Sequence, residues 1–119
     1  MSLSPWDIVS EVLKTAASFC IVFCISILNS AISSKVSWID LELEIDEKTR
    51  AELLASAKKN GIQTICSKHD ISGTPSADEI LDIVQTNAEK GDIVKFCSTI
   101  NDHQDALQIV EACQLLKDT

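Results

Sequence analysis

Residues 62–97 read IQTICSKHDISGTPSADEILDIVQTNAEKGDIVKFC, and the predicted architecture follows from them. Ile62–Cys66 and Asp92–Cys97 are short apolar runs typical of buried strands. Between them, Thr74-Pro75 predicts the start of a helix, and Gly91 ends it. A strand, a helix and a second strand in this order indicate two parallel strands joined by a helical crossover.

The predicted helix in this unit also carries a local start signal. Ser76 and Glu79 have the spacing of a capping box, in which each side chain bonds the backbone of the other residue. Its apolar positions continue to about Lys90. A helix of this length suffices to bring the chain back to the start of a parallel neighbouring strand.

A strand precedes this unit. Val36–Leu43 reads VSWIDLEL, in which Trp38 and Leu41 are apolar. Side chains alternate along a strand, so Asp40 and Glu42 share one face, which we expect to be opposite the apolar face. Two carboxylates on a buried face need cationic partners, whereas on an exposed edge strand they would meet solvent. Both interpretations stay open.

Two further helices complete the pattern. Asp46 can cap a helix over Glu47–Asn60, which Gly61 terminates, and Asn101 or Asp102 can cap a last helix. The apolar stripe predicted for the last helix is Ala106, Ile109, Val110, Cys113 and Leu116. Strands that alternate with helices predict an α/β protein, either a doubly wound sheet or part of a β/α barrel.

Length and composition indicate one folded domain and limit the kinds of molecule that the chain can bind. The chain has 119 residues, which suggests one domain, and its 45% apolar residues are too many for a disordered chain. It carries 10 Lys and Arg against 18 Asp and Glu, a net charge of −8. An acidic surface repels phosphate backbones, so we expect no nucleic-acid partner.

The cysteines match no known framework. There are five: Cys20, Cys24, Cys66, Cys97 and Cys113. Their odd number and their spacing fit neither a set of disulfides nor a zinc motif. We interpret them as small apolar residues in a reducing cytosol, with metal binding as the less favoured alternative.

The N-terminal third contains an uncharged stretch, Thr15–Ser34, which is long enough to span a bilayer. Ser, Thr and Asn are frequent in it, and Asp7, Glu11 and Lys14 precede it rather than a basic cluster. We therefore expect a buried helix and no membrane association. A membrane anchor stays open as an alternative, and a signal peptide is the least favoured.

Lys95 lies inside the apolar strand at 92–97. Taking an ammonium out of water is costly, so the pKa of a lysine in such a strand is expected to fall. The neutral amine can then attack a ketone and form a Schiff base. In the alternative interpretation, the stem of Lys95 lies on apolar surface and its ammonium reaches water.

His69 follows the strand at 62–66 and is expected in a loop over Ser67–Gly73. An imidazole exchanges protons near neutral pH, which suits general acid–base catalysis. Asp70 could orient it, although adjacent side chains often point apart, and an ordinary loop histidine stays the alternative. His103 lies near the start of the last predicted helix and is assigned no role.

Glu42, His69 and Lys95 all fall at or near the carboxyl ends of predicted parallel strands. Active sites of α/β proteins lie at these ends. The sequence contains no glycine-rich phosphate loop, no nucleophile elbow and no spaced set of metal ligands. We therefore predict a catalytic site without a cofactor or a metal.

Three short motifs carry a resemblance. IDLEL at 39–43, SKHD at 67–70 with TP at 74–75, and DIVK at 92–95 resemble, in order and spacing, three consecutive signatures of type I 3-dehydroquinate dehydratases. LNSAI at 28–32 is similar to the end of the helix before the first of them. One such motif alone would be weak, but three in order are specific.

The resemblance implies that residues 27–119 are consecutive βα units of a TIM-type (β/α)8 barrel. That barrel would be incomplete, and an N-terminal helical segment at 1–26 without a clear family match would precede it. The implied activity is a lyase reaction of the shikimate pathway, in chorismate and aromatic amino acid biosynthesis. It converts 3-dehydroquinate into 3-dehydroshikimate without a cofactor, in the cytoplasm, usually as a dimer.

The resemblance also implies residue roles. Lys95 would form a Schiff base with the ring ketone, His69 would transfer protons, and Asp40 and Glu42 would support the site. The family holds its substrate with a Glu-x-Arg pair and with further Arg, Ser and Gln residues. We find no match to these residues in this sequence. Two alternatives stay open: an inactive α/β fragment that associates through open sheet edges, and a small membrane-anchored α/β protein.

Overall fold

A computed structural model describes residues 4–5, 8 and 23–119 of the chain. Among these residues, 23–33 are helical. The elements that follow are strand β1 (Trp38–Glu42), helix α2 (Glu47–Lys59), strand β2 (Gln63–Asp70), helix α3 (Ala77–Thr86), strand β3 (Ile93–Ser98) and helix α4 (His103–Lys117). The predicted alternation of strands and helices is therefore confirmed.

The strands form one parallel sheet in the order β1-β2-β3, so that each strand pairs with the next one in the sequence. The register aligns Glu42 with Ser67, and Ser67 with Lys95. Register partners point to the same side of a sheet. Side chains from all three strands therefore meet on one face near the carboxyl ends. Within the described part of the chain, the outer edges of β1 and β3 pair with no further strand.

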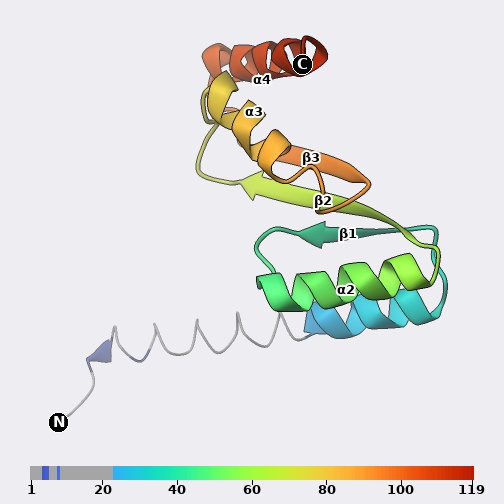
Figure 1. The fold of residues 1–119 in the computed structure, drawn as a ribbon. Coiled ribbons are helices and arrows are strands. Elements are labelled where there is room, and N and C mark those ends of the chain that lie inside the picture. Colours follow the sequence, from blue (N-terminus) through green and yellow to red (C-terminus); the bar gives the residue numbers. More distant parts are fainter. Residues whose placement is uncertain (1–3, 6–7, 9–22) are drawn as a thin grey trace.

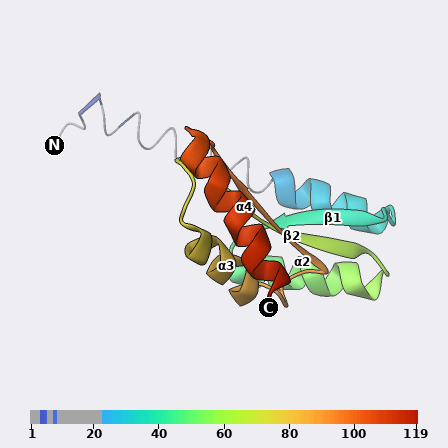
Figure 2. The ribbon, with the colours of Figure 1, turned by 90° about the horizontal axis from the view of Figure 1, so that it is seen from above.

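The main core lies on the opposite face of β1. Leu41 is completely buried there and Ile39 is 5% exposed. They pack with Leu53 and Ala57 of α2 and with Ile32 of the helix at 23–33. Figures 1 and 2 show these two helices beside β1, whereas α3 and α4 lie at the β3 end of the sheet. Because this core anchors β1, the alternate residues Asp40 and Glu42 must point the other way.

A second, smaller core joins α3 and α4. Ala77, Ile80 and Ala112 are buried, and Phe96 of β3 packs against them. The predicted stripe of α4 is partly wrong, because Val110 is 65% exposed, and Ala106 and Cys113 are exposed too. The helix contacts α3 rather than the sheet, so the face around Ala112 is the one it buries.

One predicted boundary, the end of the second strand, is wrong in a way that matters for the site. β2 continues past Cys66 to Asp70, so His69 lies in a strand and not in a loop. The middle strand has a partner on both sides here, with Leu43 N donating to Ser67 O at 2.8 Å and Thr99 N to Asp70 O at 2.9 Å. Hydrogen bonds to both neighbours extend a strand beyond its apolar run.

The other differences are smaller. β1 begins at Trp38 rather than Val36, and α3 ends at Thr86 instead of reaching Lys90. Trp38 shares the face of Asp40 rather than that of Leu41, and it is 41% exposed. Strand alternation decides its side, because Trp38 and Asp40 are two positions apart in the strand.

The helix starts follow the sequence signals. Asp46 and Asp102 cap α2 and α4, and Ser76 and Glu79 form the predicted capping box at α3. Gly61 has a φ of 70° directly after the C-cap of α2. This left-handed conformation is costly for residues with a Cβ, which explains why glycine stands there.

The predictions for the N-terminal third concern residues of which the structure describes only a part. Residues 15–22 of the uncharged stretch and most of the segment 1–26 lie outside the described residues. Across 4–5, 8 and 23–119, no helix has the length and apolar character needed to cross a bilayer. In the same ranges Cys24, Cys66, Cys97 and Cys113 are free, whereas Cys20 lies outside them.

Candidate active site

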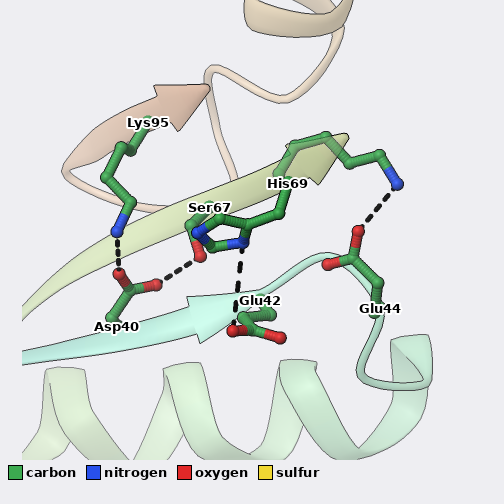
Figure 3. A network of polar contacts seen from close by, with 7 residues as sticks. Asp40, Glu42, Glu44, Ser67, His69 and Lys95 are labelled. Carbon is green, nitrogen blue, oxygen red and sulfur yellow. Dashed lines mark hydrogen bonds and ion pairs between the residues drawn. The ribbon is translucent and has the colours of Figure 1, made fainter. Parts of the chain in front are cut away.

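A lysine from β3 reaches across the middle strand to a carboxylate on β1. Lys95 Nζ lies 2.7 Å from Asp40 Oδ2, in the geometry of a charge-assisted hydrogen bond. Neighbouring strands are about 4.8 Å apart, so the long lysine stem is what allows contact across two strand spacings. Figure 3 shows this direct contact, with Ser67 of β2 beside it.

Ser67 joins the pair from the middle strand. Its hydroxyl donates to Asp40 Oδ1 at 2.5 Å, so each carboxylate oxygen has a donor. The Ser67 side chain is completely buried, whereas the side chains of Asp40 and Lys95 are 35% and 41% exposed. The sheet face therefore carries a chain of contacts, Ser67–Asp40–Lys95, that is fixed at one end and open to solvent at the other.

The electrostatics of this pair correct one expectation. The hydrogen bond that Lys95 donates to Asp40 raises the pKa of Lys95 above its usual range, and this outweighs the opposing effect of desolvation. Burial by itself raises the pKa of Asp40, but the hydrogen bonds from Lys95 and Ser67 outweigh it and leave this pKa lowered. The predicted low pKa of Lys95 is therefore wrong, because a carboxylate faces the ammonium.

His69 lies two residues beyond Ser67 in β2, and its side chain is therefore on the same face of the sheet. Its Nδ1 is 3.9 Å from Glu42 Oε1, which is within ion-pair range but too long for a hydrogen bond. The two side chains are 36% and 57% exposed. The imidazole is thus accessible at the open end of the site, beside the Glu42 carboxylate.

Asp70 does not orient His69. Its Oδ1 accepts from the backbone N–H and the hydroxyl of Ser72. Adjacent residues of a strand point to opposite faces, and Asp70 accordingly lies on the other side of β2. Asp40 and Glu42, by contrast, have the predicted basic neighbours on this face: Lys95 for Asp40 and His69 for Glu42.

One group of side chains has the composition of a cation site. Glu42, Glu44 and His69 each place a potential ligand atom within 4.8 Å of the others. Glu44 Oε1, however, is 2.7 Å from Lys68 Nζ (Figure 3). This ammonium holds the pKa of Glu44 below its usual range despite burial. Because Lys68 already neutralises Glu44, the geometry gives no reason to invoke a metal.

Sequence reasoning missed Ser67 and the pair Glu44–Lys68. The signal for Ser67 was present, because it lies two residues before His69 and would share its face if the strand continued. The assumption of a loop after Cys66 hid this relationship. Nothing in the sequence pointed to Glu44–Lys68, because Lys68 points away from the face of His69 and reaches Glu44 around the end of β1.

Fold and site together define a class of protein. Consecutive parallel βα units that carry a lysine, a histidine and carboxylates at the strand carboxyl ends are a segment of a β/α-barrel enzyme scaffold. A family model described as type I 3-dehydroquinase matches residues 22–119. The chain belongs to this family.

Curated relatives agree with the family. A 3-dehydroquinate dehydratase of Alkaliphilus oremlandii is 40% identical over 81 residues, which cover 67% of this chain and 32% of the relative. One of Methanococcus vannielii is 36% identical over 89 residues, covering 73% of this chain and 40% of the relative. The chain spans between about a third and two fifths of the length of these relatives.

Solved structures agree with the fold. The type I 3-dehydroquinate dehydratase of Clostridium difficile superposes with a TM-score of 0.71 at 24% identity, covering 77% of this chain and 37% of that one. The enzyme of Enterococcus faecalis gives the same TM-score and identity, with 39% of its chain covered. The three strands and their helices are therefore part of a TIM-type barrel fold.

Proposed function

We propose that the chain supplies the Schiff-base half of a 3-dehydroquinate dehydratase site. The observation that carries the proposal is Lys95, aimed over the middle strand at Asp40, with His69 on the same face. The curated relatives carry the name of this activity. The catalytic residues proposed are Lys95 and His69, with Asp40 and Glu42 in support, and residues 27–119 as the domain that holds them.

The reaction begins at Lys95. Its ammonium passes a proton to Asp40 along the 2.7 Å hydrogen bond, which leaves a neutral amine with a free electron pair. The amine attacks the ring ketone, and a carbon–nitrogen bond forms while the carbonyl oxygen becomes a hydroxyl. This hydroxyl takes the proton back from Asp40 and leaves as water, so the product is a protonated imine on Lys95.

His69 then transfers protons. The positive imine withdraws electrons more strongly than a ketone, so the hydrogen on the neighbouring carbon becomes acidic. His69 removes it, and the electron pair forms an enamine. The enamine expels the β-hydroxyl, which leaves as water with the proton from His69. Hydrolysis of the conjugated imine returns Lys95 as an ammonium and releases 3-dehydroshikimate.

The proposed catalytic residues do not include the groups that would bind the substrate carboxylate and hydroxyls. Substrate dehydroquinate carries a carboxylate and hydroxyls, and the described part of the chain places no arginine on this face, since Arg50 is buried in α2. Positioning contributes many kcal/mol to typical catalysis. We therefore place turnover in a completed barrel, in a cytoplasmic protein that acts as a homo-oligomer without cofactor.

Borohydride trapping tests the proposal. The purified chain is mixed with 3-dehydroquinate and borohydride, and its intact mass is measured, followed by peptide mapping. An adduct on Lys95 that is absent in Lys95→Ala supports the proposal. Lys68→Ala is the matched control, because Lys68 is also ion-paired at this end of the sheet and should leave trapping intact. No adduct in the unmodified chain would overturn the proposal.

A second candidate function rests on the open sheet edges. β1 and β3 have no outer partner among the described strands, and Trp38 and Ile93 beside these edges are 41% and 48% exposed. Unpaired edges with apolar neighbours favour association between chains. Light scattering during gel filtration measures the association, and borohydride trapping on the same sample separates the two functions, since a chain that only associates would give oligomers without any Lys95 adduct.

A further inference from the structure

Ser67 stands out from its surroundings on the site face. Its side chain is completely buried and lies on the middle strand, in register with Glu42 on one side and Lys95 on the other. A buried hydroxyl needs a hydrogen-bond partner. Its partner is Asp40 Oδ1 at 2.5 Å, and not a group of the surrounding core.

The direction of this hydrogen bond follows from charge. An ionised carboxylate only accepts, so the Ser67 hydroxyl is the donor. The second oxygen, Oδ2, accepts from Lys95 at 2.7 Å. With one donor on each oxygen, the carboxylate plane of Asp40 is fixed relative to the rigid middle strand.

We propose that Ser67 is a positioning residue, which orients the Asp40 carboxylate so that Asp40 in turn aims Lys95 across the sheet. A lysine stem has four rotatable bonds, and 41% of this side chain is exposed, so packing alone does not fix it. The hydroxyl of Ser67 bonds Asp40 and not Lys95, so Ser67 acts on the lysine through the carboxylate. The consequence of Ser67 for catalysis rests on the proposed function. The effect of Ser67 on the position of Lys95 does not.

The proposal makes Ser67 act in two ways. It holds Asp40 where Lys95 can reach it, and it stabilises the ionised form of the carboxylate, which keeps the pKa of Asp40 low. Both effects strengthen the pair with Lys95. Without the hydroxyl, Asp40 is free to rotate toward solvent, because only one of its oxygens keeps a donor.

A purely structural role for Ser67 makes a different prediction. In that case Ser67 is a small residue that fits between strands, and Ser67→Ala keeps the fit and leaves Lys95 unchanged. β2 offers a matched control in Thr64, which is 2% exposed and donates through its hydroxyl to Asp92 Oδ2 at 3.2 Å. Thr64→Val removes a similar buried hydroxyl–aspartate contact away from Lys95.

The experiment is a titration of Lys95 in the full chain by nuclear magnetic resonance, with isotope-labelled lysine and no substrate. Lys95→Arg assigns the signal. We expect the pKa of Lys95 to fall in Ser67→Ala and in Asp40→Asn, and to stay unchanged in Thr64→Val. In the Asp40→Asn background, Ser67→Ala should have no further effect, because Ser67 acts only through Asp40.

Two results would overturn the proposal. One is an unchanged pKa of Lys95 in folded Ser67→Ala. The other is that Ser67→Ala shifts the pKa of Lys95 equally in the unmodified chain and in the Asp40→Asn background. Ser67→Cys, which keeps the shape with a weaker donor, provides the test if Ser67→Ala does not fold. Borohydride trapping of dehydroquinate is measured alongside, with an expected loss of about 10- to 100-fold in rate for Ser67→Ala. Failure of trapping in the unmodified chain rejects the proposed function and leaves the titration result standing.

Discussion

Asp40 and Lys95 lie on the two outer strands of the sheet, yet their side chains meet over the middle strand with 2.7 Å between Oδ2 and Nζ. The contact keeps the lysine positively charged at rest, since it raises the pKa of Lys95 and leaves that of Asp40 lowered. In the proposed reaction Lys95 must therefore give up its proton before it attacks the ketone, and Asp40 is the carboxylate in hydrogen-bond contact with it.

Asp40→Asn tests this electrostatic relationship. An amide keeps a hydrogen-bond acceptor but carries no charge, so the pKa of Lys95 should fall toward its ordinary value. Isotope-edited titration of Lys95 measures the change. Glu42→Gln is the control, because Glu42 contributes least among the groups that affect Lys95. A larger shift in Glu42→Gln than in Asp40→Asn would contradict the assignment of Asp40 as the partner.

The same pair predicts a pH dependence of stability. The lowered pKa of Asp40 stabilises the fold above about pH 4, and this stabilisation is lost as the pH falls through the folded-state pKa. The raised pKa of Lys95 stabilises it below about pH 10, and this is lost as the pH rises through the folded-state pKa.

Urea unfolding of the unmodified chain and of Lys95→Met checks this dependence. The difference in free energy of unfolding should be largest near neutral pH and should narrow at pH 3 and at pH 11. Lys117→Met serves as the control, since Lys117 lies exposed at the end of α4. A difference that is the same at all three pH values would mean that Lys95 contributes through packing and not through charge.

The sequence was sufficient for the order of strands and helices, and for the meeting of Glu42, His69 and Lys95 at one end of the sheet. Alternation along β1 fixed the shared face of the carboxylates, and parallel pairing brought the carboxyl ends together. These are local and topological rules, so no knowledge of distant contacts was needed.

What the sequence missed depends on contacts between elements. β2 extends past Cys66 to include His69 only because both neighbouring strands pair with it. A prediction from the sequence of one strand ends that strand at its last apolar residue. The pKa of Lys95 was predicted in the wrong direction for the same reason, since the opposing charge lies on another strand. α4 buries Ala112 rather than Val110 because its neighbour is α3.

Leu41→Ala tests the main core. Leu41 is completely buried between the sheet and α2, so its truncation leaves a cavity and should lower the free energy of unfolding by about 2–5 kcal/mol. Urea denaturation measures the loss. Leu107→Ala is matched in chemistry but changes a side chain that is 53% exposed, and should have a much smaller effect. Equal losses would mean that Leu41 is not a core residue in solution.

Gly91→Ala tests the close packing between the end of the α3–β3 connection and β2. A Cβ at this position would lie 2.9 Å from the backbone N of Cys66 and 3.0 Å from its Cβ. Overpacking of this kind costs about 1–3 kcal/mol. Thermal unfolding should show a lower midpoint for Gly91→Ala but little change for Gly73→Ala, where the nearest atom is 3.6 Å away. Unchanged stability of Gly91→Ala would show that the connection lies further from β2.

His69→Gln separates the two halves of the proposed reaction. His69 is not needed to hold Lys95, whose partner is Asp40, so borohydride should still trap dehydroquinate on Lys95. Proton transfer by a positioned side chain contributes about 10²–10⁴-fold, so appearance of the enone should slow by that factor wherever turnover is measurable.

His103→Gln is the matched control for this experiment, because His103 is exposed at the start of α4 and contacts only Gln104 among the described side chains. It should leave both trapping and turnover unchanged. Loss of trapping together with turnover in His69→Gln would mean that His69 acts in imine formation itself. In that case Lys95 would lose its proton to the imidazole, and Asp40 would only hold the resting ammonium in place.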